Sequence, residues 1–243
     1  LSYSKLSSLI PQLKREYPWL KDVDSVAIQC SVKTLSDTFD RFFKGVCRYP
    51  KFKSRKQTVQ SYLSTIRGEN IRFNGNQRYV KLPKLGWVKC RMSVPHIENE
   101  RIKSVTIKQK PSGKYMMSVL VTSENQTLPK THQTVGIDLG VSDFAITSDG
   151  HKYRSQRLHL KYQKQLHVLE KRMARRRLRA KAEDKSLSES KNYQKARQQV
   201  ARIHEKIVHT RKDYIHKITT DLVKNYDVIV IEDLKTSNLL KNH

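Results

Sequence analysis

The chain has 243 residues, with 49 Lys and Arg against 22 Asp and Glu, which gives a formal net charge of +27 at pH 7. Self-repulsion on this scale opposes a compact state and favours a polyanionic partner, so we expect nucleic acid rather than a small neutral substrate. A hydrophobic content of 37% still allows one or two domains with packed cores. No run of about 18 apolar residues occurs, so no membrane partner is expected.

The cysteines indicate free thiols. Cys30, Cys47 and Cys90 are odd in number and lack a CxxC spacing, which argues against a disulfide framework and against a zinc site within this chain. Free thiols favour a cytoplasmic location. The sequence starts with Leu and stops soon after an apolar run, so we expect a fragment, and nothing in it indicates an oligomeric state.

Residues 1–48 are expected to form a helical recognition segment. Leu6, Ile10 and Leu13 indicate a short first helix that Pro11 complicates. From Val23 to Phe43, apolar or small side chains recur at the spacing of a helix. We expect Asp22 or Asp24 to cap this second helix, and Gly45 and Pro50 to follow its end.

Residues 49–130 are expected to form a basic, β-rich module. The turn sequence Asn74-Gly75-Asn76, flanked by apolar residues on both sides, predicts a hairpin. A second hairpin is predicted to join Ile102–Lys108 with Tyr115–Thr122.

Residues 131–243 predict three strands, two long basic helices and a fourth strand. The strands are Thr134–Leu139, Phe144–Thr147, His151–Arg154 and Asp227–Glu232. This order is the connectivity of an RNase H-like fold, in which the first and fourth strands are parallel neighbours. The predicted fold class is therefore an α+β front half followed by an α/β RNase H-like core with long basic helices, incomplete at its C-terminus.

The positive charge is concentrated in two blocks. Residues 41–91 hold 14 basic and 1 acidic side chains, and residues 152–217 hold 21 basic and 6 acidic ones. Such blocks are typical either of solvated faces or of a groove that follows phosphates, and we favour the groove. The residues expected to bind nucleic acid are Lys51, Lys53, Arg55, Lys56, Arg172, Arg175, Arg176, Arg177, Arg179, Arg211 and Lys212.

Aromatic and histidine side chains add weaker signals. Tyr62, Phe73, Tyr79 and Trp87 lie among basic residues and are candidates for stacking on unpaired bases, although a core position is equally favoured for Phe73 and Trp87. The histidines of the last predicted helix lack the i, i+4 spacing of metal ligands, so surface positions are expected for them.

Two carboxylates interrupt strands that are otherwise apolar. Asp138 lies within Val135–Gly140, and Glu232 closes the run that starts at Val228. Facing carboxylates on adjacent strands repel unless a cation lies between them, and oxygen ligands suit Mg²⁺ or Mn²⁺. Two such ions promote phosphodiester cleavage, so the pair is the candidate catalytic and metal site. The alternative is that Asp138 caps a turn and Glu232 pairs with an arginine.

Four stretches resemble the TnpB family of transposon-encoded, RNA-guided DNA endonucleases, which are relatives of the compact type V CRISPR effectors. They are Tyr49–Arg55, Val135–Gly150, Arg202–Lys217 and Val230–Leu239, in the order of the family. The resemblance implies that Asp138 and Glu232 are the first two carboxylates of a RuvC nuclease site. It also implies a guide RNA and target DNA as partners, which the β-rich module of residues 49–130 is expected to hold. A prokaryotic, nucleoid-associated location and a link to DNA recombination are implied as well.

The sequence also departs from that family. TnpB-like proteins begin with a further basic β segment and continue into a third RuvC Asp and a zinc ribbon, and these segments are not in the sequence. We therefore expect this chain alone to bind Mg²⁺ weakly and to cut DNA slowly or not at all. Asp143 and Asp233 are the nearest candidates for another carboxylate that completes the site. Three functions stay open: an RNA-guided endonuclease, an RNA-guided DNA-binding protein or repressor without cleavage, and a guide-independent resolvase or transposase, which the β-rich front half disfavours.

Overall fold

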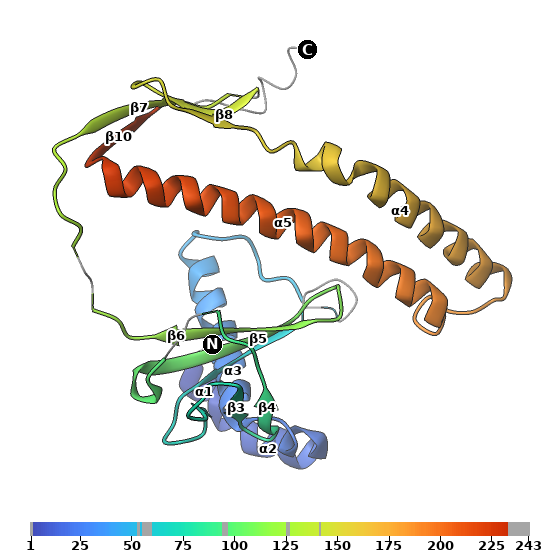
Figure 1. Cartoon of the computed structure of the whole chain (residues 1–243). Coiled ribbons are helices and arrows are strands. Elements are labelled where there is room, and N and C mark those ends of the chain that lie inside the picture. Colours follow the sequence, from blue (N-terminus) through green and yellow to red (C-terminus); the bar gives the residue numbers. More distant parts are fainter. Residues whose placement is uncertain are drawn as a thin grey trace. The chain divides into compact units, whose positions relative to one another are not determined.

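A computed structural model of the chain describes residues 2–52, 54, 60–93, 97–124, 127–140 and 142–232 (Figure 1). It divides into two compact units, residues 1–124 and 125–243, each with helices and sheets. The mixed helix and strand content agrees with the predicted α+β class. Among the described residues, no helix has the length and apolar character needed to cross a membrane.

The first unit begins with helices. They are α1 (Tyr3–Ser8), α2 (Ile10–Glu16), a 3₁₀ turn (Pro18–Lys21) and α3 (Ser25–Phe43). Pro11 lies in the first turn of α2, where its missing N–H has no partner to lose, so it starts a separate helix instead of breaking a longer one. The predicted second helix is confirmed by α3.

Asp24 fastens the start of α3 to a strand. Its carboxylate accepts the N–H of Val26 at 3.0 Å and the hydroxyl of Ser64 at 2.5 Å. Both side chains are buried, because Asp24 is 9% and Ser64 1% exposed. A buried carboxylate is stable only when hydrogen bonds replace its water, so this cap also fixes where α3 lies on the sheet.

Two three-stranded sheets enclose the core of the first unit. One sheet has the order β1 (Ser61–Thr65), β5 (Ile102–Gln109), β6 (Tyr115–Val121), and the other the order β2 (Arg72–Phe73), β3 (Tyr79–Leu82), β4 (Gly86–Lys89). Both predicted hairpins are present, as β2–β3 and β5–β6. The core between the sheets consists of Ile71, Phe73, Val80, Leu82, Ile102 and Val105.

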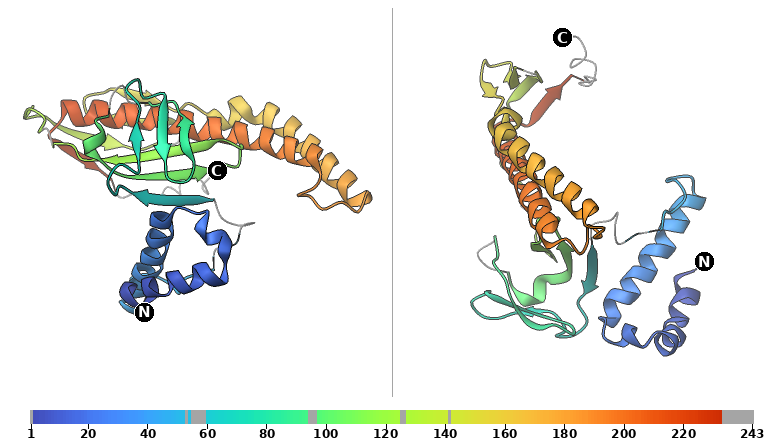
Figure 2. Two further views of the ribbon diagram at one scale, coloured as in Figure 1. Left: turned by 90° about the horizontal axis from the view of Figure 1, so that it is seen from below. Right: turned by 90° about the vertical axis from the view of Figure 1, so that its right-hand side faces the viewer.

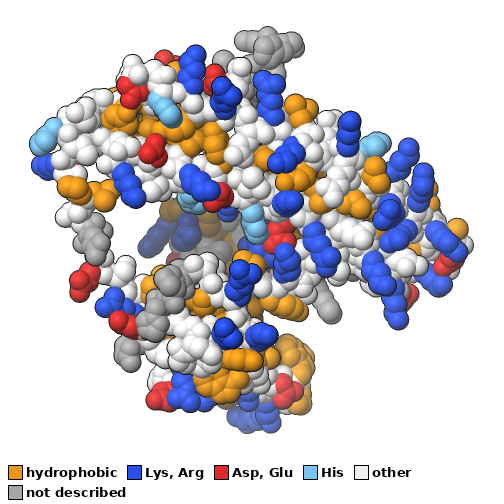
Figure 3. Space-filling model, in the orientation of Figure 1, with side chains coloured by type: hydrophobic (Ala, Val, Ile, Leu, Met, Phe, Trp, Pro, Cys, Tyr) orange, Lys and Arg blue, Asp and Glu red, His pale blue; other side chains and the backbone are white. Residues whose placement is uncertain are grey.

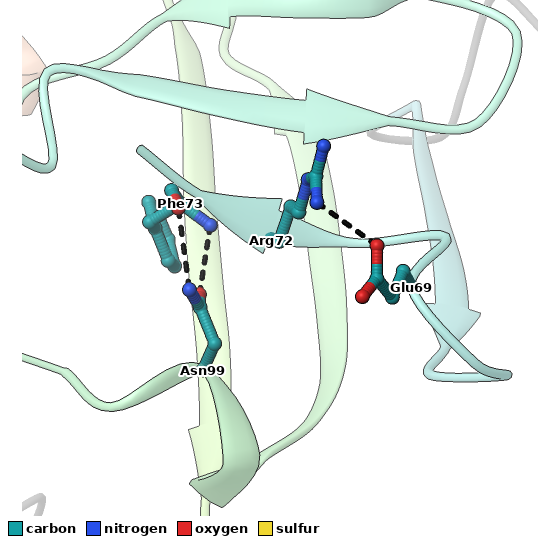
Figure 4. A network of polar contacts seen from close by, with 4 residues as sticks. All are labelled: Glu69, Arg72, Phe73 and Asn99. Carbon is teal, nitrogen blue, oxygen red and sulfur yellow. Dashed lines mark hydrogen bonds and ion pairs between the residues drawn. The ribbon is translucent and has the colours of Figure 1, made fainter. Parts of the chain in front are cut away.

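The short strand β2 is held from outside the sheet by one amide side chain. Asn99, in a 3₁₀ turn (Asn99–Arg101), accepts the N–H of Phe73 at 2.8 Å and donates to its carbonyl at 3.2 Å (Figure 4). The preceding residue, Arg72, takes no part in this contact. Its guanidinium forms an ion pair with the carboxylate of Glu69 at 2.9 Å. The two-residue strand therefore has a defined buried face and a defined outer face.

The second unit contains a four-stranded sheet and a helical hairpin. Its elements are β7 (Thr134–Asp138), β8 (Asp143–Thr147), β9 (Lys152–Arg154), α4 (Leu158–Ala182), α5 (Lys191–Asn225) and β10 (Val228–Ile231). The strand order is β10-β7-β8-β9, with β10 parallel to β7 and the other pairs antiparallel. Helices α4 and α5 lie side by side, and α5 ends close to the sheet (Figure 2).

One end of α5 covers one face of this sheet. Ile218 and Leu222 of the helix pack against Val135, Ile137 and Ala145 of the strands, and all five are buried. Apolar residues at the spacing of a helix meet apolar residues at every second strand position, which is the pattern that the sequence shows.

Polar contacts reinforce this packing around its rim. Tyr226 donates to Asp149, and the hydroxyl of Tyr153 donates to Asp221 of α5 at 2.8 Å. Hydrogen bonds from Thr147, from Tyr226 and from the His151 N–H lower the pKa of Asp149 from 3.8 to about 2. Burial, followed by the bond to Asp221, raises the pKa of Tyr153 to about 12.

Replacing Asp24 with Ala should lower the free energy of unfolding of the first unit by about 2 kcal/mol, because it removes a helix cap and leaves Ser64 unsatisfied. Asp22→Ala, at the other sequence-predicted cap, is the matched control and should change it by less than about 0.5 kcal/mol. Both tryptophans, Trp19 and Trp87, belong to this unit, so urea unfolding followed by tryptophan fluorescence measures it selectively. Equal effects of the two substitutions would contradict the assignment of the cap.

Asp149→Asn should flatten the acid dependence of stability of the second unit. The folded-state pKa lies below the unfolded one, so the carboxylate stabilises the fold above about pH 4, and this contribution is lost as the pH falls from 3.8 towards 2. Urea midpoints from circular dichroism at several pH values in this window provide the test. Asp184→Asn is the control, since this exposed carboxylate makes no hydrogen bond within the described residues. If the urea midpoint of the unsubstituted protein does not change between pH 4 and pH 2, the prediction is wrong.

Candidate metal centre and nucleic-acid interface

The parallel pairing of β10 with β7 brings the two candidate metal ligands together. Ile231 is the register partner of Ile137, so the next residues, Glu232 and Asp138, follow at the same end of neighbouring strands. Successive side chains of a strand point to opposite faces. Ile137 packs towards α5, and Asp138 therefore lies on the other face of the sheet, together with Glu232.

The face of the sheet opposite α5 carries an open groove of about 390 Å³, as formed by the described residues. Gly136 forms part of it, and its N–H donates to the hydroxyl of Ser148 at 3.1 Å. A Cβ at position 136 would lie 3.7 Å from the Ser148 side chain, an ordinary contact distance, so a larger residue there would take up part of the groove that the glycine leaves open. The residues that line the groove are Gly136, Ile137, Asp138, Ile146, Thr147, Ser148, Val230, Ile231 and Glu232.

Both carboxylates are exposed to solvent. Within the described residues, neither Asp138 nor Glu232 makes a hydrogen bond or an ion pair, so the two alternative roles, a turn cap and an arginine partner, are not seen there. Two unpaired carboxylates on one side of a groove offer oxygen ligands of the kind that Mg²⁺ and Mn²⁺ prefer. The donor set fits a hard divalent ion.

No third ligand joins the pair in the part of the chain that the structure describes, where no cluster of three or more His, Cys, Asp or Glu side chains suits a metal ion. Asp143 pairs in register with Arg154 on β9 and does not line the groove. Asp233, the other candidate, lies outside the described residues. The histidines lie apart: His204 is 4.0 Å from Glu170, and His209 is 3.9 Å from Glu205.

The structure separates the arginines of α4 into two groups. Arg176 donates to the carbonyl of Asn192 on α5 at 2.8 Å, and Arg179 pairs with Glu183 at 3.1 Å. Arg172, Arg175 and Arg177 are exposed and have no partner among the described residues. Lys and Arg side chains crowd the surface of the helical hairpin (Figure 3). Arg176 therefore has a structural contact, while the other three are free to meet phosphates.

The other predicted contact residues lie in different places. Lys51 is exposed and lines a cavity of about 570 Å³ between α3 and β1, within the first unit. Arg211 and Lys212 are exposed on α5, and Arg211 lines a smaller cavity of about 150 Å³ together with Arg157. The predicted contacts Lys53, Arg55 and Lys56 lie outside the described residues.

Arg157 is a residue that sequence reasoning missed. It precedes α4 in a left-handed conformation with φ of 41°, which is uncommon for a residue other than glycine. No pattern in the sequence marks this conformation. Gly136 and Ser148 were also missed, although the alternation of side chains along β7 places Gly136 on the same face as Asp138.

The aromatic candidates divide between core and surface. Phe73 is 4% exposed and belongs to the core, whereas Tyr79 is 40% and Trp87 48% exposed. Tyr62 is half-buried, and burial, followed by the charge of Asp24, raises its pKa. The core position is therefore confirmed for Phe73 and wrong for Trp87.

Comparison with known proteins defines the class of this chain. The family OrfB of IS605, described as "Probable transposase", matches residues 116–243, which is more than half of the chain. The chain is 33% identical over its whole length to "Putative RNA-guided DNA endonuclease InsQ" of Escherichia coli, and it covers 57% of that protein. It is 31% identical to a "Putative RNA-guided DNA endonuclease" of Streptomyces pristinaespiralis, of which it covers 58%.

The chain thus belongs to the transposon-associated OrfB family of IS605. Together with the two relatives named as RNA-guided endonucleases, this makes it a member of the TnpB family. It spans less than two thirds of the length of these relatives.

Proposed function

We propose that this chain is the part of an RNA-guided DNA endonuclease that holds guide RNA and target DNA and supplies two carboxylates of a RuvC-type, RNase H-like nuclease centre. The observation that carries the proposal is the placement of Asp138 and Glu232 on parallel neighbouring strands, over an open groove. The sheet order β10-β7-β8-β9, with a helical crossover before β10, supports an RNase H-like core.

Asp138 and Glu232 are the residues that would hold Mg²⁺ or Mn²⁺. When bound, a pair of such ions activates the attacking water and stabilises the leaving oxygen of a phosphodiester. The work of the chain itself is to position these carboxylates and to bring the DNA strand to them. The uncharged floor of the groove, formed by the half-buried Gly136 and Ile146 and the exposed Val230, suits the sugar edge of a strand more than its phosphates.

The basic blocks are proposed to hold the nucleic acids. Arg172, Arg175 and Arg177 are exposed and free within the described residues, so phosphate contacts by them do not compete with internal ion pairs. Release of counterions from phosphates favours binding to such a surface. It also offsets the self-repulsion of a chain with a net charge of +27.

A second candidate function is RNA-guided DNA binding without cleavage, as in a repressor. One observation favours binding without cleavage: among the described residues, only two carboxylates lie at the groove, and no third metal ligand joins them. The two candidates share all nucleic-acid contacts and differ only at the metal site, so cleavage is the measurement that separates them.

Binding should depend steeply on salt. If the basic blocks meet about 8 phosphates, affinity should fall by roughly three to four decades between about 50 and 200 mM salt. Replacing Arg172, Arg175 and Arg177 with Ala should lower the slope of log affinity against log salt by about 3, with the sequence preference unchanged. Fluorescence anisotropy with labelled RNA gives the slope.

The control for this triple variant removes three exposed lysines outside both basic blocks: Lys5, Lys21 and Lys33. Its slope should match that of the parent chain. Equal losses in the two triple variants would show that total charge, and not the α4 surface, determines binding.

The 243-residue chain should bind RNA but not cleave a plasmid target in Mg²⁺. Two carboxylates supply too few oxygen ligands to hold two metal ions, so one side of the metal site stays open. A longer version that restores a third carboxylate and a zinc ribbon should cleave. In that version, Asp138→Asn and Glu232→Gln should each lower the cleavage rate by at least about 100-fold, with RNA binding preserved.

Asp143→Asn is the matched control, since Asp143 does not line the groove, and it should keep most of the activity. Robust cleavage by the 243-residue chain would show that another carboxylate completes the site. Loss of RNA binding in Asp138→Asn would indicate a structural role for this residue instead.

A further inference from the structure

The outer face of the β2–β3–β4 sheet carries an unusual combination of side chains. Val80 pairs with Phe73, and both are buried, as is Leu82. Alternation along the strands then places Arg72, Lys81 and Trp87 in one cross-strand row on the opposite face. The adjoining row pairs Tyr79 with Lys89. We name these five residues the outer platform.

The aromatic rings of the outer platform are accessible. Tyr79 is 40% and Trp87 48% exposed, although both belong to regular strands in which apolar side chains normally pack inward. They are diagonal neighbours across the β3–β4 pair, a relation that places side chains about 7–8 Å apart. Each ring therefore has room to accept a separate flat partner.

Trp87 makes a cation–π contact with Arg72. The guanidinium carbon of Arg72 lies 5.7 Å from the centre of the indole ring, and Arg72 itself is fixed by Glu69 at 2.9 Å. Figure 4 shows Arg72 directed towards Glu69, while Phe73, the next residue, is held by Asn99. A contact of this kind restricts the indole, so Trp87 loses less conformational freedom when a ligand stacks on it than a side chain without a neighbour would.

The charge of this surface selects the partner. Three of the five platform residues are basic, and Arg78, Lys84 and Arg91 lie within three positions of a platform residue in sequence. Glu69 is the only acidic residue between 41 and 91. Exposed rings on a sheet among cations suit unpaired nucleotides, because bases stack on the rings while phosphates meet the cations. A duplex hides its base faces and gains only the charge contacts.

We infer that the outer platform binds unpaired nucleotides of the guide RNA by stacking bases on Tyr79 and Trp87. This inference rests on the proposed function, which supplies the RNA. A guide RNA offers unpaired nucleotides outside its pairing segment at all times, whereas a DNA strand is unpaired only while a target is open. The two rings are accessible in the chain without a bound target, which matches the RNA.

The two tryptophans of the chain allow a direct test. Trp19→Phe leaves Trp87 as the only tryptophan, and Trp87→Phe leaves Trp19, which is 61% exposed on the 3₁₀ turn after α2. The 243-residue chain with either substitution is titrated with single-stranded oligouridine of about 20 nucleotides. Stacking should quench the fluorescence of Trp87 and leave that of Trp19 unchanged. A blunt RNA duplex of the same length, at saturation by anisotropy, should quench neither.

Affinity provides the second measurement. Trp87→Leu, which keeps an apolar side chain without a π face, should weaken oligouridine binding by about tenfold, and Trp87→Phe should retain most of it. Tyr79→Leu should act like Trp87→Leu, with duplex binding unchanged in both. Lys81→Ala should lower the salt slope by about 1 and keep the quenching. Circular dichroism confirms that each variant is folded.

The outcomes separate this inference from the proposed function. Tight oligouridine binding with unquenched Trp87, or with unchanged affinity in Trp87→Leu, overturns the platform while RNA binding itself stands. Absence of any RNA binding overturns both. Tighter binding and full quenching by oligodeoxythymidine would assign the platform to an open DNA strand and overturn the assignment to RNA.

Discussion

The parallel pairing of β10 with β7 is the constraint on which the second unit depends. It joins two segments more than ninety residues apart and is the reason that Asp138 and Glu232 share a groove. Neither strand has enough residues to be stable alone, so the pair relies on α5 and on the hydrogen bonds around it. Asp227 contributes directly, because it accepts the N–H groups of Thr131 and His132 at 3.1 and 2.8 Å, just before both strands begin.

The distribution of charge follows from this constraint. The paired strands and the residues of α5 that cover them are apolar, so the excess of Lys and Arg is carried elsewhere, mainly on the hairpin of α4 and α5 and on the β-rich module. Repulsion between like charges is weakest when they are spread along extended elements and screened by water. The chain thereby keeps a neutral core and still offers two basic surfaces. These surfaces differ in kind: the hairpin offers a dense cluster of cations, and the outer platform combines cations with aromatic rings.

Much of this arrangement could be predicted from the sequence. Helix α3 and its cap, both hairpins, the strands of the second unit and the neighbouring positions of Asp138 and Glu232 all follow from periodicity and turn residues. Strands β1 and β4 were missed, because Ser61–Thr65 has little apolar alternation and Gly86–Lys89 is exposed throughout. The exposure of Trp87 could not be predicted either, since an indole in a short strand more often packs inward. The contact of Arg176 with Asn192 is another such case: a row of arginines looks uniform until the structure shows which one bonds to the next helix.

The long separation between β7 and β10 has a consequence for how the protein forms. Thr131 and Asp227, which hydrogen-bond across the start of the strand pair, are 96 residues apart along the chain. Contacts of such high sequence separation form slowly, whereas the α4–α5 hairpin needs only local contacts. During synthesis, β7, β8 and β9 leave the ribosome before the two helices and β10. Until β10 is synthesised, the edge of β7 that later pairs with it has no partner. For that interval β7 is an open strand edge, and the positive charge of the helices that follow it disfavours pairing with a second copy of the same nascent chain.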